Sequence, residues 1–564
     1  MKCITRGPFR ALCWSLLIGA ASLLPVERGV CQGSSDPAVV IAIANIDEQL
    51  NDIEYLANAA SEQMGQMSGL IKMQAQGFLR GIDTKKPAGV LMYFSEDSPE
   101  PATLAFVPIK NLDDFLDTIA SFAEVDEGDD TVTIIPDDGS EMTLKKIGGY
   151  AFISDQAEFL KNAPSNPGEL VEEMASKYNI SARVFPQRIP ENLREMALGL
   201  IEQGYEQQLQ QLDQIEPMQA ELQEENFEMQ MAQMESMFTD TEEVVIGMSA
   251  DEKSRSIYFD MNMTAKAGSS MAKLMEESVA KEPSRFLGFL MEDAAMTGNV
   301  NGTIAKETAA QYKSVMSTAT DQWLDMVDGD DNMDDAQVEL VTNLINGLSD
   351  VMTKTMEQGR MDMGVALTMV DDKMNLAMGT GVADPDKLED MVKDVVKEVE
   401  KQNVDAIQFN LNSGSHRGTT FHEIIVEVPD NEEEAQNILG EQVTIILGIG
   451  KKEVYLAAGS APESLLKDAM DKSAEASASE DQPQSQMNLY MTPMLKFAAG
   501  MPGAEMLEMM ADTMESASGD RIHLETGSSK NGFKSRIEIQ DGILELLGAA
   551  GGMMGGMGGG GADF

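Results

Sequence analysis

The sequence predicts an α+β protein in which β-hairpins, each followed by an amphipathic helix, recur along the chain and build curved antiparallel sheets covered by helices. The clearest unit spans 361–401. Apolar residues alternate with small or polar ones over 361–369, and the alternation resumes over 374–378 after a polar break. A period of two on both sides of a break is typical of a hairpin with one buried face. We therefore expect the methionines of this hairpin to face the core.

A helix is predicted directly after this hairpin. Asp384 supplies a side-chain cap, and Pro385 suits the first helical position. The residues that follow form a single apolar stripe at helical spacing, namely Leu388, Met391, Val392, Val395, Val396 and Val399. The repeating unit is thus a hairpin, a short loop and an amphipathic helix.

Residues 1–31 have the composition of a secretory signal peptide. Lys2, Arg6 and Arg10 precede the apolar run 11–24, and small and polar residues follow it. The run is shorter than a bilayer span, so we expect no transmembrane anchor after signal removal. All three cysteines fall within the first 31 residues, which predicts a mature chain without disulfides. We expect an exported protein of the periplasm or the extracellular space.

Four segments follow the signal peptide. Residues 36–84 have helical spacing and predict an N-terminal helical segment. Residues 87–164 repeat the hairpin and helix and predict a first α+β unit. Residues 168–238, rich in Gln, Glu and Met, predict a helical insertion. Residues 244–357 predict a partial second unit followed by helices.

The third α+β unit spans 361–473. Its end, where a strand runs into a short helix at 453–469, parallels 149–163 in the first unit. Residues 487–547 predict C-terminal strands and a helix. Residues 548–564 consist largely of Gly and Met and predict a disordered tail.

The chain is strongly acidic, with a formal net charge of −54. Such a surface repels nucleic acid and favours cations or basic partners. A solvated exterior is the simpler interpretation. Binding of a basic protein or an envelope component is the alternative, and the sequence names no partner.

An EF-hand-like pattern is the sharpest candidate for a metal site. Its oxygen ligands would occupy loop positions one, three, five, seven and twelve between two predicted helices. These residues are Asp328, Asp330, Asn332, Asp334 and Glu339. Met333 stands where the sharp turn of the motif requires Gly. An acidic loop between helices is therefore the simpler interpretation, and a Ca²⁺ site is the alternative.

A second metal candidate is a cluster of thioethers, Met229, Met231, Met234 and Met237. Closely spaced thioethers are ligands that Cu(I) prefers. Met is also a flexible apolar residue that fills irregular cores, and the chain contains 43 of them. Core packing is the simpler interpretation.

No motif indicates catalysis or nucleotide binding. The chain has three histidines, and we expect His416 and His422 to face solvent from a strand-like segment rather than to bind zinc. The first hypothesis is an exported, non-enzymatic binding or structural protein of the periplasm or cell envelope. The alternatives are a metal-binding protein, and a carrier that holds lipid or another hydrophobic ligand in an apolar groove between sheet and helices.

The signal peptide, the acidic Met-rich body, the repeated units and the Gly-rich tail together resemble exported proteins of the planctomycete type whose function is uncharacterised. Over 87–164 and 361–473, the chain is also similar to a bacterial domain of unknown function found in secreted proteins. The resemblance implies location and architecture, and it implies no activity.

Overall fold

The computed structural model describes residues 36–211, 227, 230–232, 234–328, 333–370, 373–402, 407–429, 436, 438–476, 482–501, 504–517 and 519–558. The predicted signal peptide and the last six residues of the predicted tail lie outside these residues. The chain divides into two compact units. Unit 1 is formed from Met1–Glu206 and Met234–Lys266, and unit 2 from Gln207–Gln233 and Ala267–Phe564.

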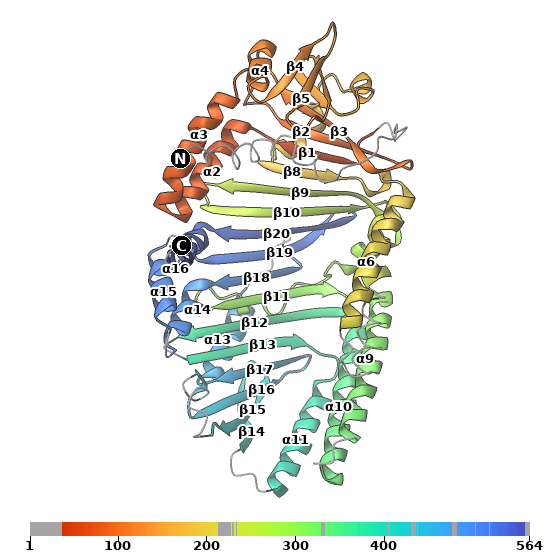
Figure 1. The fold of residues 1–564 in the computed structure, drawn as a ribbon. Coiled ribbons are helices and arrows are strands. Elements are labelled where there is room, and N and C mark those ends of the chain that lie inside the picture. The colour runs from red at the N-terminus through yellow and green to blue at the C-terminus, as the bar shows by residue number, and fades with distance from the viewer. Residues whose placement is uncertain are drawn as a thin grey trace. The chain divides into compact units, whose positions relative to one another are not determined.

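The described part of unit 1 contains an antiparallel sheet with strands β1 (Val39–Ile43), β2 (Ala88–Ser95), β3 (Ser98–Pro108), β4 (Ala123–Glu127), β5 (Val132–Pro136), β6 (Met142–Ile147), β7 (Tyr150–Ser154), β8 (Ile180–Val184), β9 (Thr241–Asp251) and β10 (Ser256–Ala265). These strands pair in the order β4-β5-β6-β7-β3-β2-β1-β8-β9-β10 (Figure 1). The first strand of the chain is therefore central in its sheet.

The helices of unit 1 connect these strands, and they are α2 (Ile46–Ala60), α3 (Glu62–Phe78), α4 (Leu112–Ile119), η1 (Phe159–Asn162), α5 (Gly168–Ala175), η2 (Pro186–Arg188) and α6 (Glu191–Gln211). Side-chain caps start three of them, because Asn45, Ser61 and Asn111 accept backbone hydrogen bonds at the N-termini of α2, α3 and α4. Ser61 is also the last residue before α3 and ends α2, so it divides a helical stretch into a pair.

The described part of unit 2 contains the strands β11 (Met296–Thr303), β12 (Arg360–Val370), β13 (Lys373–Gly381), β14 (Ile407–His416), β15 (Thr419–Glu427), β16 (Gln442–Ile449), β17 (Glu453–Gly459), β18 (Ser485–Tyr490), β19 (Arg521–Ser529) and β20 (Gly532–Gln540). They pair antiparallel in the order β14-β15-β16-β17-β13-β12-β11-β18-β19-β20. The helices of unit 2 are α8 (Ser270–Ser278), η3 (Leu287–Phe289), α9 (Lys306–Asp328), α10 (Asp335–Glu357), α11 (Pro385–Gln402), α13 (Pro462–Glu475), α14 (Met491–Ala499), α15 (Glu505–Ser516) and α16 (Asp541–Gly558).

The strands of the two units have the same connectivity. Adding ten to each strand label of unit 1 gives the strand order of unit 2. The helices follow the same scheme: a helical pair comes after the first strand of each unit, as α2 with α3 and as α9 with α10. One helix then follows the third strand, as α4 and as α11.

In each unit, one face of the sheet is covered by an aromatic core. In unit 1, the rings of Phe106, Phe152 and Tyr178 belong to a core that η1 and α5 close. In unit 2, Phe286 and Phe289 come from the segment around η3 and pack with α13 over β12, β13 and β17. Both cores combine aromatic rings with Ala or other small strand residues.

The α+β class is confirmed, but three strands lie in segments that were expected to be helical or were not expected at all. β1 lies in the predicted helical segment 36–84, and β8 lies in the predicted helical insertion 168–238. Each is only five residues long, and β1 is apolar throughout, so neither shows a clear alternation of apolar and polar residues. β11 contains two Gly and two Asn residues and has little intrinsic strand propensity.

The C-terminal segment also differs from the prediction. Residues 548–558, expected to be disordered, belong to helix α16. Ile543 and Leu546 in the first turns of this helix are buried against α15, and this packing anchors the helix despite its Gly content. Among the described residues, no helix has both the length and the apolar composition needed to span a bilayer.

Candidate functional site

The large apolar residues of β12 lie on the more open face of the unit 2 sheet. Met361 and Met363 are 41% and 37% exposed, whereas Asp362 and Ala366 on the other face are 2% and 0% exposed. The expectation that these methionines form the core is therefore wrong. The small and polar residues between them face the core instead.

Aromatic rings from outside the hairpin explain this orientation. Phe286 and Phe289 pack edge to face, with ring centroids 5.9 Å apart, against the covered side of β12 and β13. A Cβ atom on Gly364 would lie 2.6 Å from the Phe286 Cβ, and one on Gly379 would lie 2.6 Å from the Phe286 ring. Only small residues fit there. Alternation shows which residues share a face, but it does not show which face is buried.

The open face continues onto neighbouring strands. Val365 is paired with Met378, and Met378 is paired with Leu456, which is 39% exposed. Paired residues of antiparallel strands project to the same face. We define the methionine face of unit 2 by the following residues: Met361, Met363, Val365, Leu367, Met369, Met374, Leu376, Met378 and Leu456.

The methionine face is flanked at both edges by strands whose side chains on the same face of the sheet are covered by helices. Ile522 of β19 packs against Leu495 and Met514 in the core of α14, α15 and α16. On the other side, Leu456 is paired with Leu447 and Leu447 with His422, and α11 contacts the strand between them. The methionine face is therefore a bounded apolar surface.

Unit 1 has the same asymmetry. Ile246, Phe259 and Met261 are exposed, and the pairing of β9 with β10 places Ile246 opposite Met261. The alternate residue Val245 is buried in the aromatic core. Each unit thus exposes large apolar side chains on the face opposite its aromatic core, and such a surface commonly marks a binding site.

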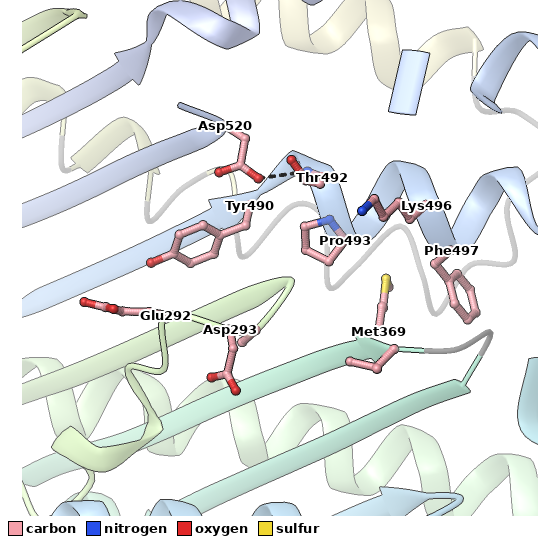
Figure 2. Close-up of a pocket in the computed structure, with 11 residues that line it drawn as sticks. Glu292, Asp293, Met369, Tyr490, Thr492, Pro493, Lys496, Phe497 and Asp520 are labelled. Atoms are coloured by element: carbon pink, nitrogen blue, oxygen red, sulfur yellow. Dashed lines mark hydrogen bonds between the residues drawn. The ribbon is translucent and has the colours of Figure 1, made fainter. Parts of the chain in front are cut away.

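A cavity of about 650 Å³ lies in unit 2 where β12 ends beside the start of α14 (Figure 2). Met369, the last residue of the methionine face on β12, is part of its wall. In Figure 2, Glu292 and Asp293 lie near Tyr490, while Met369 lies near Lys496 and Phe497. The full lining is Glu292, Asp293, Ala294, Met369, Val370, Tyr490, Thr492, Pro493, Lys496, Phe497 and Asp520.

The charged groups of this cavity differ in how they are paired. The Thr492 N–H donates to Asp520 Oδ2 over 3.0 Å, so one carboxylate caps the start of α14. Lys496 Nζ lies 2.8 Å from Glu515 Oε1, and this ion pair offsets its charge. Burial raises the pKa of Tyr490, and a phenol is neutral at pH 7 even at its ordinary pKa, so Tyr490 adds no charge to the cavity. The cavity therefore has an acidic side and an apolar side.

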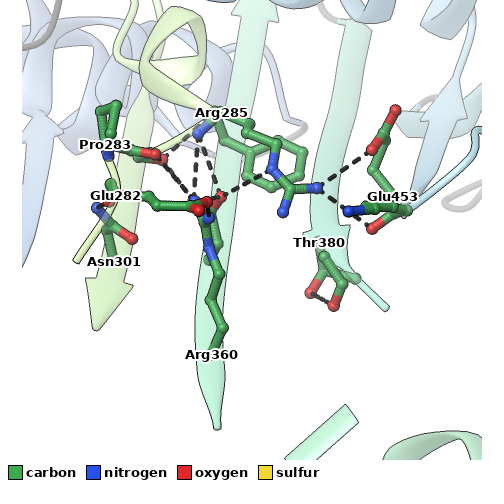
Figure 3. Close-up of polar contacts among 12 residues, drawn as sticks. Glu282, Pro283, Arg285, Asn301, Arg360, Thr380 and Glu453 are labelled. Carbon is green, nitrogen blue, oxygen red and sulfur yellow. Dashed lines mark hydrogen bonds and ion pairs between the residues drawn. The ribbon is translucent and has the colours of Figure 1, made fainter. Parts of the chain in front are cut away.

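A polar cluster surrounds Asp362 on the covered face, and Figure 3 shows Glu282, Arg285 and Arg360 of this cluster. The Ser284 hydroxyl donates to Asp362 Oδ1 over 2.7 Å, and Arg360 Nη2 donates to Oδ2 over 2.8 Å. Asn299 Nδ2 donates to the Ser284 hydroxyl over 2.8 Å. Arg285 Nη1 lies 3.3 Å from Glu453 Oε2. The carboxylate is satisfied by its neighbours, so we assign the cluster a structural role in holding the segment before η3 against the sheet.

His422 was expected to face solvent, and this expectation is wrong. Its side chain is buried, and Nε2 lies 3.9 Å from Glu389 Oε1 of α11. Burial lowers its pKa, so the ring is held in the neutral form. The pleat of β15 places His422 on the side that α11 covers, which strand alternation alone does not reveal. His416, by contrast, is half-buried and lies with Nε2 2.8 Å from Asp471 Oδ1.

The predicted Ca²⁺ ligands are only partly described. Asp330 and Asn332 lie outside the described residues. Asp328 ends α9, and Glu339 lies in α10. Asp334 caps α10: its carboxylate accepts from the Ala336 and Gln337 amides over 3.1 and 2.9 Å. This capping box gives Asp334 a structural reason to be acidic.

Of the predicted Cu(I) ligands, Met229 lies outside the described residues. Met231, Met234 and Met237 lie in helical residues before β9, and Met237 is exposed. Within the described ranges, no group of three or more His, Cys, Asp and Glu side chains is placed to hold a metal ion. Both metal sites remain predictions.

The methionines of the methionine face could be recognised in the sequence as residues that share one face, but the cavity could not be predicted. Glu292, Tyr490 and Met369 are far apart in the chain and come together only because β11 pairs with both β12 and β18. No local pattern signals that pairing. A search of protein-family models gave no match to this chain, and a search of curated proteins gave none either.

Proposed function

We propose that this protein is an exported, non-enzymatic binding protein that holds an aliphatic chain on the methionine face of unit 2. The proposal depends on one observation about β12 and β13. Their small residues lie on the covered face, and a bounded set of Met, Leu and Val side chains lies on the open face. Flexible thioether side chains adapt to irregular apolar ligands, and Met-rich surfaces often bind several of them.

We also infer that the two units are copies of one module. The shared strand order and the shared places of the helices support this inference. The segments 87–164 and 361–473 occupy equivalent places in the two orders. The exposed apolar residues of β9 and β10 would give unit 1 a second, smaller face of the same kind.

Export to the periplasm or the exterior is part of the proposal. Its support is the order of basic, apolar and small residues in the first 31 positions. An apolar ligand needs a carrier in an aqueous compartment, and an acidic exterior keeps such a carrier dispersed when part of its surface is apolar.

Displacement of a neutral fluorescent probe tests the binding proposal. N-phenyl-1-naphthylamine should bind the wild-type chain, and a long-chain alcohol should displace it. The double variant Met363→Gln/Leu456→Gln makes the face polar without touching a core and should weaken probe binding about tenfold, as expected for the loss of two apolar contacts.

The matched control is Met506→Gln/Met509→Gln, which changes two exposed apolar side chains of α15 outside the face. This control should bind the probe as the wild type does. Absence of binding to the wild type, or an equal loss in both variants, would overturn the proposal.

A further inference from the structure

We propose that the cavity beside β12 receives the cationic headgroup of an amphiphile, an alkyl amine or alkyl quaternary ammonium, whose chain lies on the methionine face. This inference rests on the proposed function, because the chain of the ligand occupies the face described above. The headgroup assignment rests on separate observations in the cavity.

The first observation is continuity between the cavity and the face. Met369 lines the cavity and belongs to the same side of β12 as Met361 and Met363. An amphiphile with its head in the cavity can therefore extend its chain past Met369 onto the row of methionines. No other set of large apolar side chains in the lining continues along a strand of the described part of unit 2.

The second observation is the charge of the wall. Glu292, Asp293 and Asp520 place three carboxylates around the cavity. The lysine of the lining, Lys496, is paired with Glu515, which is not part of the wall. Glu292 and Asp293 are exposed. Lys472 attracts Asp293 and Arg521 hydrogen-bonds to Tyr490, but neither cation belongs to the wall. The cavity therefore attracts a cation and disfavours an anion.

The third observation is the aromatic part of the wall. Tyr490 lies on the same side as Glu292 and Asp293 in Figure 2, and Phe497 lies near Met369. The electron-rich face of an aromatic ring attracts ammonium groups, and carboxylates beside it strengthen this preference. The acidic side thus fits the cationic headgroup of the ligand, and Met369 and Phe497 fit the first methylenes of its alkyl chain.

Calorimetric titration with three probes of equal chain length tests this assignment. The probes are octyltrimethylammonium, 1-octanol and octanoate, each below its micelle concentration, added to the full chain. We expect the wild type to bind octyltrimethylammonium most tightly and octanoate most weakly.

The variant Glu292→Gln/Asp293→Asn keeps the shape of both side chains and removes their charges. It should weaken octyltrimethylammonium binding about fivefold, the effect of two partly solvated ion pairs, and leave 1-octanol binding unchanged. The control Glu276→Gln/Glu277→Gln removes two neighbouring carboxylates of α8, which are exposed and outside the cavity lining. It should bind all three probes as the wild type does.

The outcomes separate the two proposals. Equal affinity for the three probes, or an equal loss of octyltrimethylammonium binding in the control, overturns the headgroup assignment and leaves the aliphatic binding function standing. Absence of binding of all three probes to the wild type overturns both. Cation preference that is lost only in Glu292→Gln/Asp293→Asn supports both.

Discussion

Asp362 shows that a charged residue can lie on the buried face of a strand when neighbouring donors satisfy it. It alternates with Met361 and Met363, yet its carboxylate is the buried group, held by Ser284 and Arg360. A buried carboxylate is tolerated only where donors satisfy it. Ser284 and the backbone N–H of Arg285 come from the segment before η3, so the segment that supplies Phe286 also supplies donors to Asp362.

We expect Asp362→Ala to lower the free energy of unfolding of unit 2 by about 3 kcal/mol, because it leaves Arg360 and Ser284 without their buried acceptor. Urea unfolding followed by Trp323 fluorescence measures this change, since Trp323 lies on α9 in unit 2. The control Asp394→Ala removes an exposed ion pair with Lys397 and should change stability by less than about 0.5 kcal/mol. Equal losses would contradict a structural role for the cluster.

The carboxyl group of Asp52 on α2 makes the stability of unit 1 depend on pH. Partial burial, followed by the charges of Glu48 and Glu252, raises its pKa to about 6 from 3.8. Asn179 Nδ2 donates to Asp52 Oδ2 over 2.5 Å. Because the folded pKa is the higher one, the stability that the neutral carboxyl contributes is fully present below pH 3.8 and is lost as the pH rises through about 6.

Asp52→Asn should therefore stabilise the chain at pH 7.5 by about 1 kcal/mol after allowance for solvent screening, while an acceptor for Asn179 remains. The gain should disappear near pH 4. Far-UV circular dichroism in urea at several pH values measures both quantities, and Asp126→Asn on β4 is the control. A gain of the same size at every pH would argue against the raised pKa of Asp52.

At the scale of elements, two glycines of β13 should differ in how much stability is lost when each is replaced by alanine. Gly379 faces the ring of Phe286, whereas the nearest atoms to a Cβ on Gly381, two residues away on the same face, lie 3.8 Å or more from it. Gly379→Ala should cost about 2 kcal/mol through overpacking, and Gly381→Ala should be close to neutral. Comparing the two urea midpoints is the measurement. Similar midpoints would show that Phe286 moves aside and that the face is not closely packed.

Strong alternation made the hairpin of β12 with β13 predictable from the sequence, and the turn-rich segment 95–101 did the same for the hairpin of β2 with β3. The same reasoning missed β1 and β8, which are five residues long, pair on both sides and carry little alternation. It missed β11 because Asn299 and Asn301 read as loop residues, although their side chains donate to Ser284 and to the Glu282 carbonyl. These three segments form strands because of contacts with residues distant in the chain, and a single sequence does not show such contacts.

At the scale of the whole molecule, the sequence predicted that 87–164 and 361–473 are copies of one unit, and this stays a prediction. The candidate site was not predictable to the same degree. The rows of Met were evident, but their exposure depends on Phe286 and Phe289, which lie more than 70 positions before β12 in the chain. Because the methionines of β12 and β13 are hydrophobic, they were expected to face the core.

The exposure of the methionine face has a chemical consequence. Thioethers are readily oxidised to sulfoxides, which are polar. Met361 and Met363 are accessible to oxidants, whereas Met174 and Met514 in the two cores are 1% and 2% exposed. Under mild peroxide, peptide mass spectrometry should find sulfoxide at Met361 and Met363 before it appears at Met174 and Met514, and probe binding should fall before the chain unfolds. Oxidation of Met514 at the same rate would contradict this order. The face would then lose its ligand in response to oxidative stress while the fold that supports it stays intact.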